Sequence, residues 1–257
     1  MENIFFALTE ELNREGRIAI LGSGQAVVWH RLAIMSKDGD WILHESEQAC
    51  RRVLATLGGR GARYRPGAPL DARWLAGGWS SHLELFDERA RRVRCDFFSR
   101  PPRLEQEEVA ALFEAEGAAP VVGLETLIRM KQTQRAKDYA VIGELARRLP
   151  AERELELTTD PDRILELAPR FPGSTRPAAR AASAGDRRSV VRSLAEEIDD
   201  LQQRDRARLS VFERAAGPYL AAVAALDRRD LALPEGHARL VELAERFLPS
   251  DPIGAPA

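Results

Sequence analysis

The sequence has little cysteine and no strong net charge. Its two cysteines, Cys50 and Cys95, are too few for a disulfide framework, and neither has a partner at the spacing of a zinc site. The 38 basic and 40 acidic residues leave a formal net charge of -2 at pH 7. The chain as a whole is therefore not attracted to nucleic acid or to membranes, and a site for a polyanion would have to be a local patch.

Long apolar runs are missing too. No stretch approaches the roughly 20 consecutive apolar residues that a membrane helix needs. The first residues, MENIFFALTEELNREG, contain neither a basic leader nor a sustained apolar segment. We therefore expect a soluble cytoplasmic protein with no membrane partner. With 257 residues, of which 44% are hydrophobic, the chain can form one large domain or two small ones.

Lysine is scarce as well. Only Lys37, Lys131 and Lys137 are lysines, and arginine supplies every other basic position. A compositional preference for arginine explains most of this bias. Because lysine carries a compact charge and arginine a wide planar fork, the three exceptions are candidates for positions where the shape of the cation matters.

Periodicity predicts a mixed α/β (α+β) region up to about residue 150. Apolar residues at helical spacing predict helices, and short alternating or continuous apolar runs predict strands. The expected helices cover about residues 2–15, 25–32, 47–57, 104–116, 124–131 and 137–148, and the expected strands begin at Arg17 and near Lys37 and form a hairpin between Trp79 and Ser99. Residues 60–78, rich in glycine, proline and arginine, are expected to form a loop.

The remainder of the chain has a different composition. Five prolines between residues 150 and 177, followed by RPAARAASAGD, are typical of a linker. A long helix comes next, and its apolar stripe must meet either a helix at residues 219–226 or a partner, which would be another protein or a second copy of the chain. The stripe consists of Val191, Leu194, Ile198, Leu201, Leu209 and Phe212. We therefore expect a domain at residues 1–150, a helical region at 151–250 and a flexible tail at 251–257.

The stretch Asp38-Gly39-Asp40 has two interpretations. Asp-Gly between apolar runs is typical of a two-residue hairpin turn. If a strand instead begins near Lys37, Asp38 and Asp40 project from one face, about 6.6 to 7 Å apart along the chain, and Trp41 begins the opposite, apolar face. Two carboxylates placed in this way can share divalent cations.

A glycine-rich turn, Gly22-Ser23-Gly24, lies between an expected strand and an expected helix. Free backbone N–H groups and the positive end of a helix dipole make such a turn a candidate seat for phosphate. The turn lacks the spacing and the Lys-Ser/Thr pair of a Walker loop, so it does not identify a P-loop enzyme.

Taken together, these motifs resemble the signature of the polymerase-β-like nucleotidyltransferase superfamily, in particular its minimal and AbiEii-like toxin branch. The resemblance rests on Gly22-Ser23 followed by Asp38-x-Asp40, on the strand VRCDFF with Asp96, and on LETLIRMKQTQRAKDYAVIGEL with Lys131, Lys137 and Asp138. It covers about residues 1–150 and implies a nucleotidyltransferase fold, in which a small mixed sheet is flanked by helices.

The resemblance also implies a reaction and a set of site residues. Asp38, Asp40 and Asp96 would be the catalytic and Mg²⁺-binding carboxylates, with Asp96 as the base or as a ligand of a second metal ion. The nucleotide-binding residues would be Gly22, Ser23, Gly24, Lys131, Lys137 and Asp138. The reaction would transfer a nucleoside monophosphate from an NTP to a hydroxyl of RNA, protein or a small molecule.

Two departures from the family pattern leave a second hypothesis open. Gly39 stands where an apolar residue is usual, and Ile34 stands where an arginine is frequent. The chain could therefore be a catalytically silent binding or assembly module, for example in a toxin–antitoxin or defence system. Lys131 and Asp138 both fall on apolar helix stripes, and a purely structural ion pair between them is the alternative to a role at the triphosphate.

Overall fold

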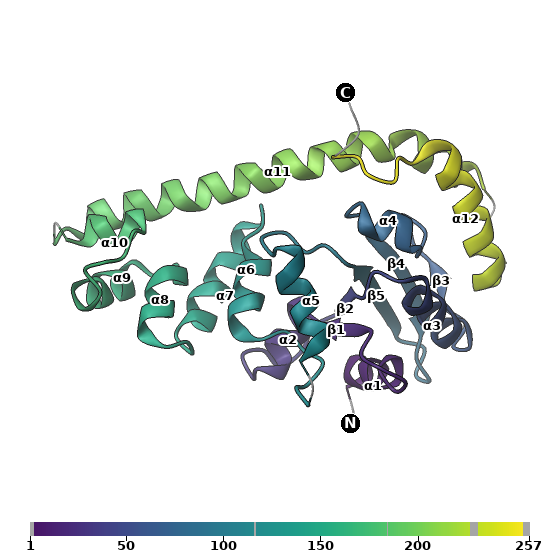
Figure 1. Cartoon of the computed structure of the whole chain (residues 1–257), viewed down its shortest axis with the longest axis horizontal. Coiled ribbons are helices and arrows are strands. Elements are labelled where there is room, and N and C mark those ends of the chain that lie inside the picture. The colour runs from purple at the N-terminus through teal and green to yellow at the C-terminus, as the bar shows by residue number, and fades with distance from the viewer. Residues whose placement is uncertain (1–2, 116, 184, 227–230, 254–257) are drawn as a thin grey trace. The chain divides into compact units, whose positions relative to one another are not determined.

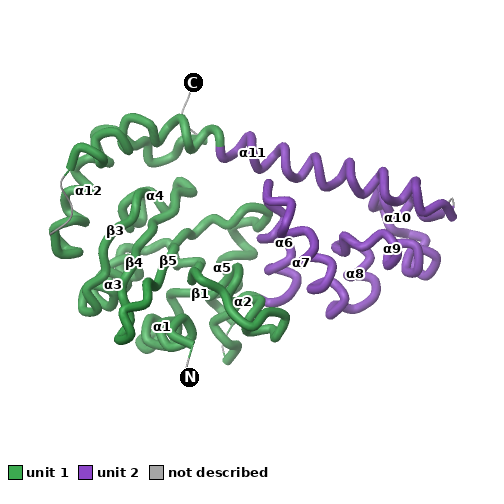
Figure 2. Tube along the Cα trace, turned by 180° about the vertical axis from the view of Figure 1, so that it is seen from behind, with its two compact units in different colours: residues 1–122, 210–257 green, residues 123–209 purple. Residues whose placement is uncertain are grey.

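The computed structural model describes residues 3–115, 117–183, 185–226 and 231–253. The chain forms two compact units, shown in different colours in Figure 2. Residues 1–122 and 210–257 make up the first, here called the sheet unit, and residues 123–209 make up the second, the helical unit. Helix α11 (Arg187–Ala225) contributes to both. No helix among the described residues is both long and apolar enough to cross a membrane.

The sheet unit contains one mixed sheet, labelled in Figure 1. Its strands are β1 (Ala19–Leu21), β2 (Asp38–Leu43), β3 (Arg63–Tyr64), β4 (Ser81–Phe86) and β5 (Arg92–Phe98). They lie in the order β1-β2-β5-β4-β3, in which β2 and β5 pair parallel and the other neighbours pair antiparallel. The expected mixed α+β class and the expected hairpin, β4–β5, are therefore confirmed.

One face of this sheet is buried and the other is polar. Alternate residues of β4 and β5 enter the core, whereas all three residues of β1 and the last three of β2 are buried. Helices α1 (Ile4–Leu12) and α3 (Glu47–Gly58) add apolar side chains to the same core. At its centre Trp41 stacks on Phe97, with ring centroids 5.2 Å apart, and its Nε1 donates to Thr9 Oγ1 at 2.8 Å. The indole is thus buried without leaving its N–H unsatisfied.

Local sequence signals account for several helix boundaries. Ser46 caps α3 by accepting a hydrogen bond from the Ala49 N–H, as a serine at this position predicts. The remaining helices before residue 123 are α2 (Ser23–Trp29), α4 (Ala72–Ala76) and α5 (Gln106–Glu114). The expected loop at residues 60–78 is in part wrong, because it contains β3 and α4. Asp71 caps α4, and Trp74 and Leu75 are buried, so this segment is anchored despite its glycine and proline content.

The C-terminal residues complete the sheet unit. Residues 210–225 of α11 and helix α12 (Leu233–Phe247) pack against the segment that contains α4. Trp79 meets Phe212 edge to face, with ring centroids 4.9 Å apart, and Tyr219 is fully buried. A separate helix at residues 219–226 is not present, because α11 continues through Pro218 to Ala225. Of the predicted flexible tail, residues 254–257 lie outside the described residues.

The helical unit consists of short helices and the first part of α11. These are α6 (Leu124–Lys131), α7 (Ala136–Ala146), α8 (Ala151–Leu157), α9 (Pro161–Leu167), the 3-10 turn Ala168–Arg170 and α10 (Pro177–Ala182). The proline-rich stretch is therefore packed structure and not a linker. Pro161 and Pro177 begin helices, where a missing N–H is tolerated, and Leu155 and Ile164 are fully buried. The observed division at residue 122 differs from the expected one near 150, because α6 packs on α7 and α7 packs on α8.

The structure gives a packing reason for the unusual glycine between the two aspartates. Gly39 lies on the buried face of β2. A Cβ atom added at this position would lie 2.4 Å from Trp41 Cη2 and 2.5 Å from Phe5 Cδ1, which is too close for real atoms. The rings of Trp41 and Phe5 thus fill the space that an apolar side chain at position 39 would occupy. Gly39 is a requirement of this core, and by itself it is not a sign of a decayed site.

We expect Gly39→Ala to destabilise the protein by about 1–3 kcal/mol, because the added methyl group overpacks the core at two aromatic rings. Urea unfolding followed by tryptophan fluorescence measures this change. The matched control is Gly217→Ala in α11, where an added Cβ meets no atom within 4 Å; there alanine should be neutral or slightly stabilising. Equal stability of the two variants would show that the Trp41 side chain readily moves aside.

Burial favours the neutral form of His237, a residue of α12. Tyr64 Oη accepts from the Leu70 N–H at 3.0 Å and lies 2.9 Å from His237 Nδ1. The hydroxyl can donate its proton to an unprotonated Nδ1 or accept a hydrogen bond from a protonated one, so this contact forms in either tautomer of the neutral ring. Burial lowers the pKa of His237, and the charge of Asp71 offsets only part of this effect. Protonation therefore opposes the packing of α12 on β3.

This pKa shift predicts a loss of stability in mild acid. The unfolded chain binds a proton at His237 near pH 6.5, whereas the folded chain does so only at lower pH. The stability that the neutral His237 contributes to the folded state is thus complete above about pH 6.5. It is lost as the pH falls through that value toward the lower pKa of the folded state. Urea midpoints at about pH 7.5 and about pH 5.5 should differ less in His237→Asn than in the wild type. An unchanged difference would assign the acid sensitivity to other groups.

Candidate active site

The polar face of the sheet collects the carboxylates that the sequence singles out. Asp38 and Asp40 lie in β2 itself, so the strand interpretation holds and the hairpin-turn interpretation is wrong. In the parallel β2–β5 pair, Asp40 is the register partner of Asp96, and Asp38 is the partner of Arg94. Register partners in neighbouring strands share a face and lie about 4.8 Å apart. Asp38, Asp40 and Asp96 are therefore close neighbours on one surface.

The two aspartates of β2 have different surroundings. Asp38 Oδ1 lies 3.4 Å from Arg94 Nη1, and both side chains are 39% exposed. A long, exposed ion pair of this kind contributes only about 0–1 kcal/mol, so Asp38 can exchange its partner for a cation at little cost. Asp40 is half-buried, and its backbone carbonyl accepts from the Gly22 N–H at 2.8 Å. This bond fixes the glycine-rich turn against β2.

The glycine-rich turn contributes fewer N–H groups than its sequence implies. The Gly22 N–H is already bonded to Asp40 and is not directed at a ligand. Ser23 has a φ of 45°, in the left-handed region that non-glycine residues seldom adopt. A Cβ at Gly24 would lie 2.3 Å from Ser36 Oγ, so a larger residue here would require the Ser36 side chain to move. The role of this turn in phosphate binding stays a prediction.

Asp96 is engaged by two side chains that the sequence did not single out. Its Oδ1 accepts from Arg65 Nη1 at 2.8 Å and lies 2.9 Å from His82 Nδ1. His82 is the register partner of Asp96 in β4, so Asp40, Asp96 and His82 form one row across three strands. The alternation in SHLELF places His82 on a polar face, but its partner follows only from the hairpin register, which the sequence alone did not fix.

A groove of about 580 Å³ opens beside Asp38 in the sheet unit. It is lined by Asn3, Ile4, Phe5, Ile34, Met35, Ser36, Lys37, Asp38, Asp87, Arg91, Arg92, Val93 and Arg94. Its walls carry four cationic and two acidic side chains, and Ile34, which is 98% exposed, forms an apolar lip. The position where the family pattern has an arginine is thus part of the rim of this groove, and Lys37 supplies its one lysine.

The donor set fits a metal ion only together with a ligand. Among the described residues, no three His, Cys, Asp or Glu side chains are gathered closely enough to hold a metal by themselves. Mg²⁺, however, is usually bound by one or two carboxylates together with substrate phosphates and water. Asp38 and Asp40, two carboxylates on one face of a strand, match that requirement.

The other predicted nucleotide-binding residues belong to the helical unit. Lys131 Nζ lies 3.6 Å from Asp138 Oδ1, and both side chains are buried. Asp138 also accepts from Arg135 Nε at 2.8 Å. Lys137 is exposed in the first turn of α7. The structural ion pair is therefore present, and a role of Lys131, Lys137 or Asp138 at the triphosphate stays a prediction.

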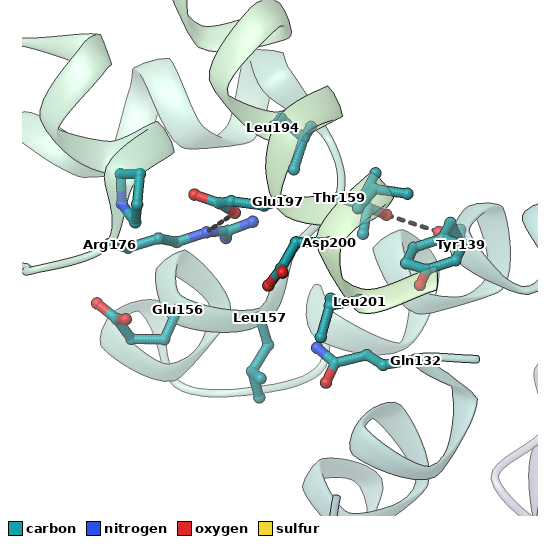
Figure 3. A pocket seen from close by; sticks show the side chains of 12 residues that line it. Gln132, Tyr139, Glu156, Leu157, Thr159, Arg176, Leu194, Glu197, Asp200 and Leu201 are labelled. Carbon is teal, nitrogen blue, oxygen red and sulfur yellow. Dashed lines mark hydrogen bonds and ion pairs between the residues drawn. The ribbon is translucent and has the colours of Figure 1, made fainter. Parts of the chain in front are cut away.

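A second pocket, of about 330 Å³, lies within the helical unit (Figure 3). Its lining includes Leu194, Ile198 and Leu201 from the apolar stripe of α11. Arg176 reaches into it and donates to Glu197 through Nε at 2.9 Å. Leu194 packs in the core of this unit, so part of the stripe is covered by α8, α9 and α10 of the same chain.

Comparisons with known proteins give little further information. No protein-family model matches the sequence, and no curated protein matches it. A solved structure from H. pylori, provisionally described as a nucleotidyltransferase, is similar over 79% of this chain and 94% of its own, with 12% identity and a TM-score of 0.38. A TM-score this low does not establish a shared fold. The function proposed below therefore rests on the geometry of the polar face.

Proposed function

We propose that the chain is a nucleotidyltransferase, which moves a nucleoside monophosphate from an NTP to an acceptor hydroxyl with Mg²⁺. The observation that carries the proposal is the position of Asp38 and Asp40 on the exposed side of a central strand, with Asp96 in register beside them. The groove next to Asp38 supports it, because its cationic walls complement the charge of a triphosphate.

The chain's own residues have distinct tasks in this reaction. Asp38 and Asp40 would hold the metal ion together with the triphosphate. Mg²⁺, when bound, neutralises phosphate charge as the leaving pyrophosphate forms. Lys37 and the arginines of the groove attract the phosphates. The acceptor is RNA, a protein or a small molecule, and the proposal extends to a cytoplasmic enzyme of the AbiEii-like toxin branch.

One observation favours the alternative of a silent binding module. Both Asp38 and Asp96 already contact arginines, Arg94 and Arg65, at 3.4 and 2.8 Å. In a decayed site such pairs would neutralise the carboxylates permanently. An NTP-dependent thermal shift separates the two hypotheses, since a ligand at 100 times its Kd adds about 2.7 kcal/mol of stability. No shift with any of the four NTPs and Mg²⁺ would favour the silent module.

Asp38→Asn and Asp40→Asn should each abolish Mg²⁺-dependent transfer of label from an α-phosphate-labelled NTP to total RNA or cell lysate. Each amide loses the charge that holds the metal but keeps the shape of the side chain, so thermal unfolding should change little. Glu84→Gln is the matched control, because Glu84 lies on the same face in the row of Asp38 and pairs with Arg92. Full transfer by Asp40→Asn would contradict the proposed metal site.

Metal binding should depend on the nucleotide, because the chain alone offers too few ligands. Electron paramagnetic resonance titration with Mn²⁺ is expected to show binding at least about tenfold tighter in the presence of an α,β-methylene NTP analogue. Asp38→Asn should remove this gain. Equally tight Mn²⁺ binding without nucleotide would show that the protein forms a metal site of its own and would contradict the shared site.

A further inference from the structure

His82 has one ring nitrogen bound to a carboxylate. Its Nδ1 lies 2.9 Å from Asp96 Oδ1, and the same oxygen accepts from Arg65 Nη1 at 2.8 Å. Because an ionised carboxylate only accepts hydrogen bonds, the proton of the ring must be on Nδ1. A neutral His82 therefore carries its lone pair on Nε2. The ring has the tautomer that a general base requires.

The orientation of the ring is fixed on a second edge. Gly67 lies so close to it that an added Cβ would be 2.5 Å from His82 Cδ2 and 3.3 Å from the Ser80 carbonyl oxygen. The backbone at Arg65 is held as well, since its N–H donates to the His82 carbonyl at 2.8 Å. With Nδ1 on Asp96 and Cδ2 against Gly67, the edge that carries Nε2 and Cε1 is the one left to meet a ligand. The His82 side chain is 31% exposed.

We propose that His82 is the general base of the transfer reaction and that Asp96 is the residue that positions it. This inference rests on the proposed function and revises one part of it, because the family resemblance gives the base role to Asp96 itself. Asp96 is poorly suited to that role, since its Oδ1 already accepts two hydrogen bonds. The row Asp40–Asp96–His82 places the base two strands, or about 10 Å, from the metal-binding strand, which leaves room for the α-phosphate and the acceptor between them.

The acceptor hydroxyl oxygen forms a bond to the α-phosphorus, and its proton passes to His82 Nε2. The bond from the α-phosphorus to the bridging oxygen breaks, and pyrophosphate leaves with the electron pair. His82, now an imidazolium, is stabilised by Asp96 and later releases its proton to water. Arg65 shares Asp96 Oδ1 with His82 and so helps to hold that carboxylate in place beside the ring.

The test uses the full chain, α-phosphate-labelled NTPs, Mg²⁺ and total RNA or lysate as the acceptor source. His82→Asn removes Nε2 but keeps an N–H donor near the position of Nδ1, so Asp96 stays satisfied. We expect its transfer rate to fall by about 10²–10⁴-fold, the usual contribution of a general base, while nucleotide-dependent Mn²⁺ binding changes less than about twofold. His44→Asn, an exposed histidine outside the polar face, is the control and should keep the full rate.

Two further measurements separate a base from a structural residue. His82→Ala leaves space for a free imidazole. Added imidazole should raise the transfer rate of this variant at least about tenfold, whereas it would not rescue a variant with a structural defect. Nitrogen-15 NMR of the wild-type histidines should show His82 protonated on Nδ1. A His82 protonated on Nε2 when neutral would overturn the proposal without any activity assay.

The outcomes distinguish this inference from the proposed function. Label transfer by the wild type together with an undiminished rate in His82→Asn would overturn the base assignment alone. Loss of nucleotide-dependent Mn²⁺ binding in Asp96→Asn would also overturn it, because Asp96 would then be a metal ligand. A wild-type chain that shows neither an NTP-dependent thermal shift nor label transfer overturns the proposed function, and the assignment of a base then falls with it.

Discussion

The parallel pairing of β2 with β5 is the constraint on which the candidate site depends. It sets Asp40 beside Asp96 and Asp38 beside Arg94 on the polar face, and on the opposite face it stacks Trp41 on Phe97. A slip of one residue would move every side chain of β2 to the wrong face and would expose the indole to water. The aromatic stack therefore fixes the register of the carboxylates above it. The same β2–β5 pairing thus aligns the aromatic core on one face of the sheet and the carboxylates of the candidate site on the other.

Charge balance explains how several acidic side chains can share this surface. Coulomb repulsion between carboxylates in neighbouring strands is offset by cations in the same rows, Arg94 beside Asp38 and Arg65 beside Asp96. The two pairs differ in strength. The pair of Asp38 is long and half exposed, so a metal–phosphate ligand can replace it, whereas Asp96 has a short contact to Arg65 and a second one to His82. Asp38 can therefore exchange its arginine for another ligand, whereas Asp96 is held by two short contacts.

The sequence predicted what depends on local periodicity. Alternation in β2 placed Asp38 and Asp40 on one face, and the capping serine Ser46 marked the start of α3. It did not predict what depends on register or on distant packing. The contact between His82 and Asp96 requires the alignment of two strands across a turn, and the prolines at residues 161 and 177 begin packed helices although their composition is that of a linker. The link of Lys131 to Asp138 was recognised only as one of two alternatives.

The C-terminal part of the chain packs in the sheet unit and supports the candidate site there. Tyr219 of α11 is buried and donates through its hydroxyl to the Gly67 carbonyl at 3.1 Å. Gly67 in turn lies against the ring of His82, and His82 contacts Asp96. A helix far away in sequence therefore supports the loop that orients the polar row. The first 150 residues contain the carboxylates but not this support, so the site is a property of the whole sheet unit and not of its N-terminal segment alone.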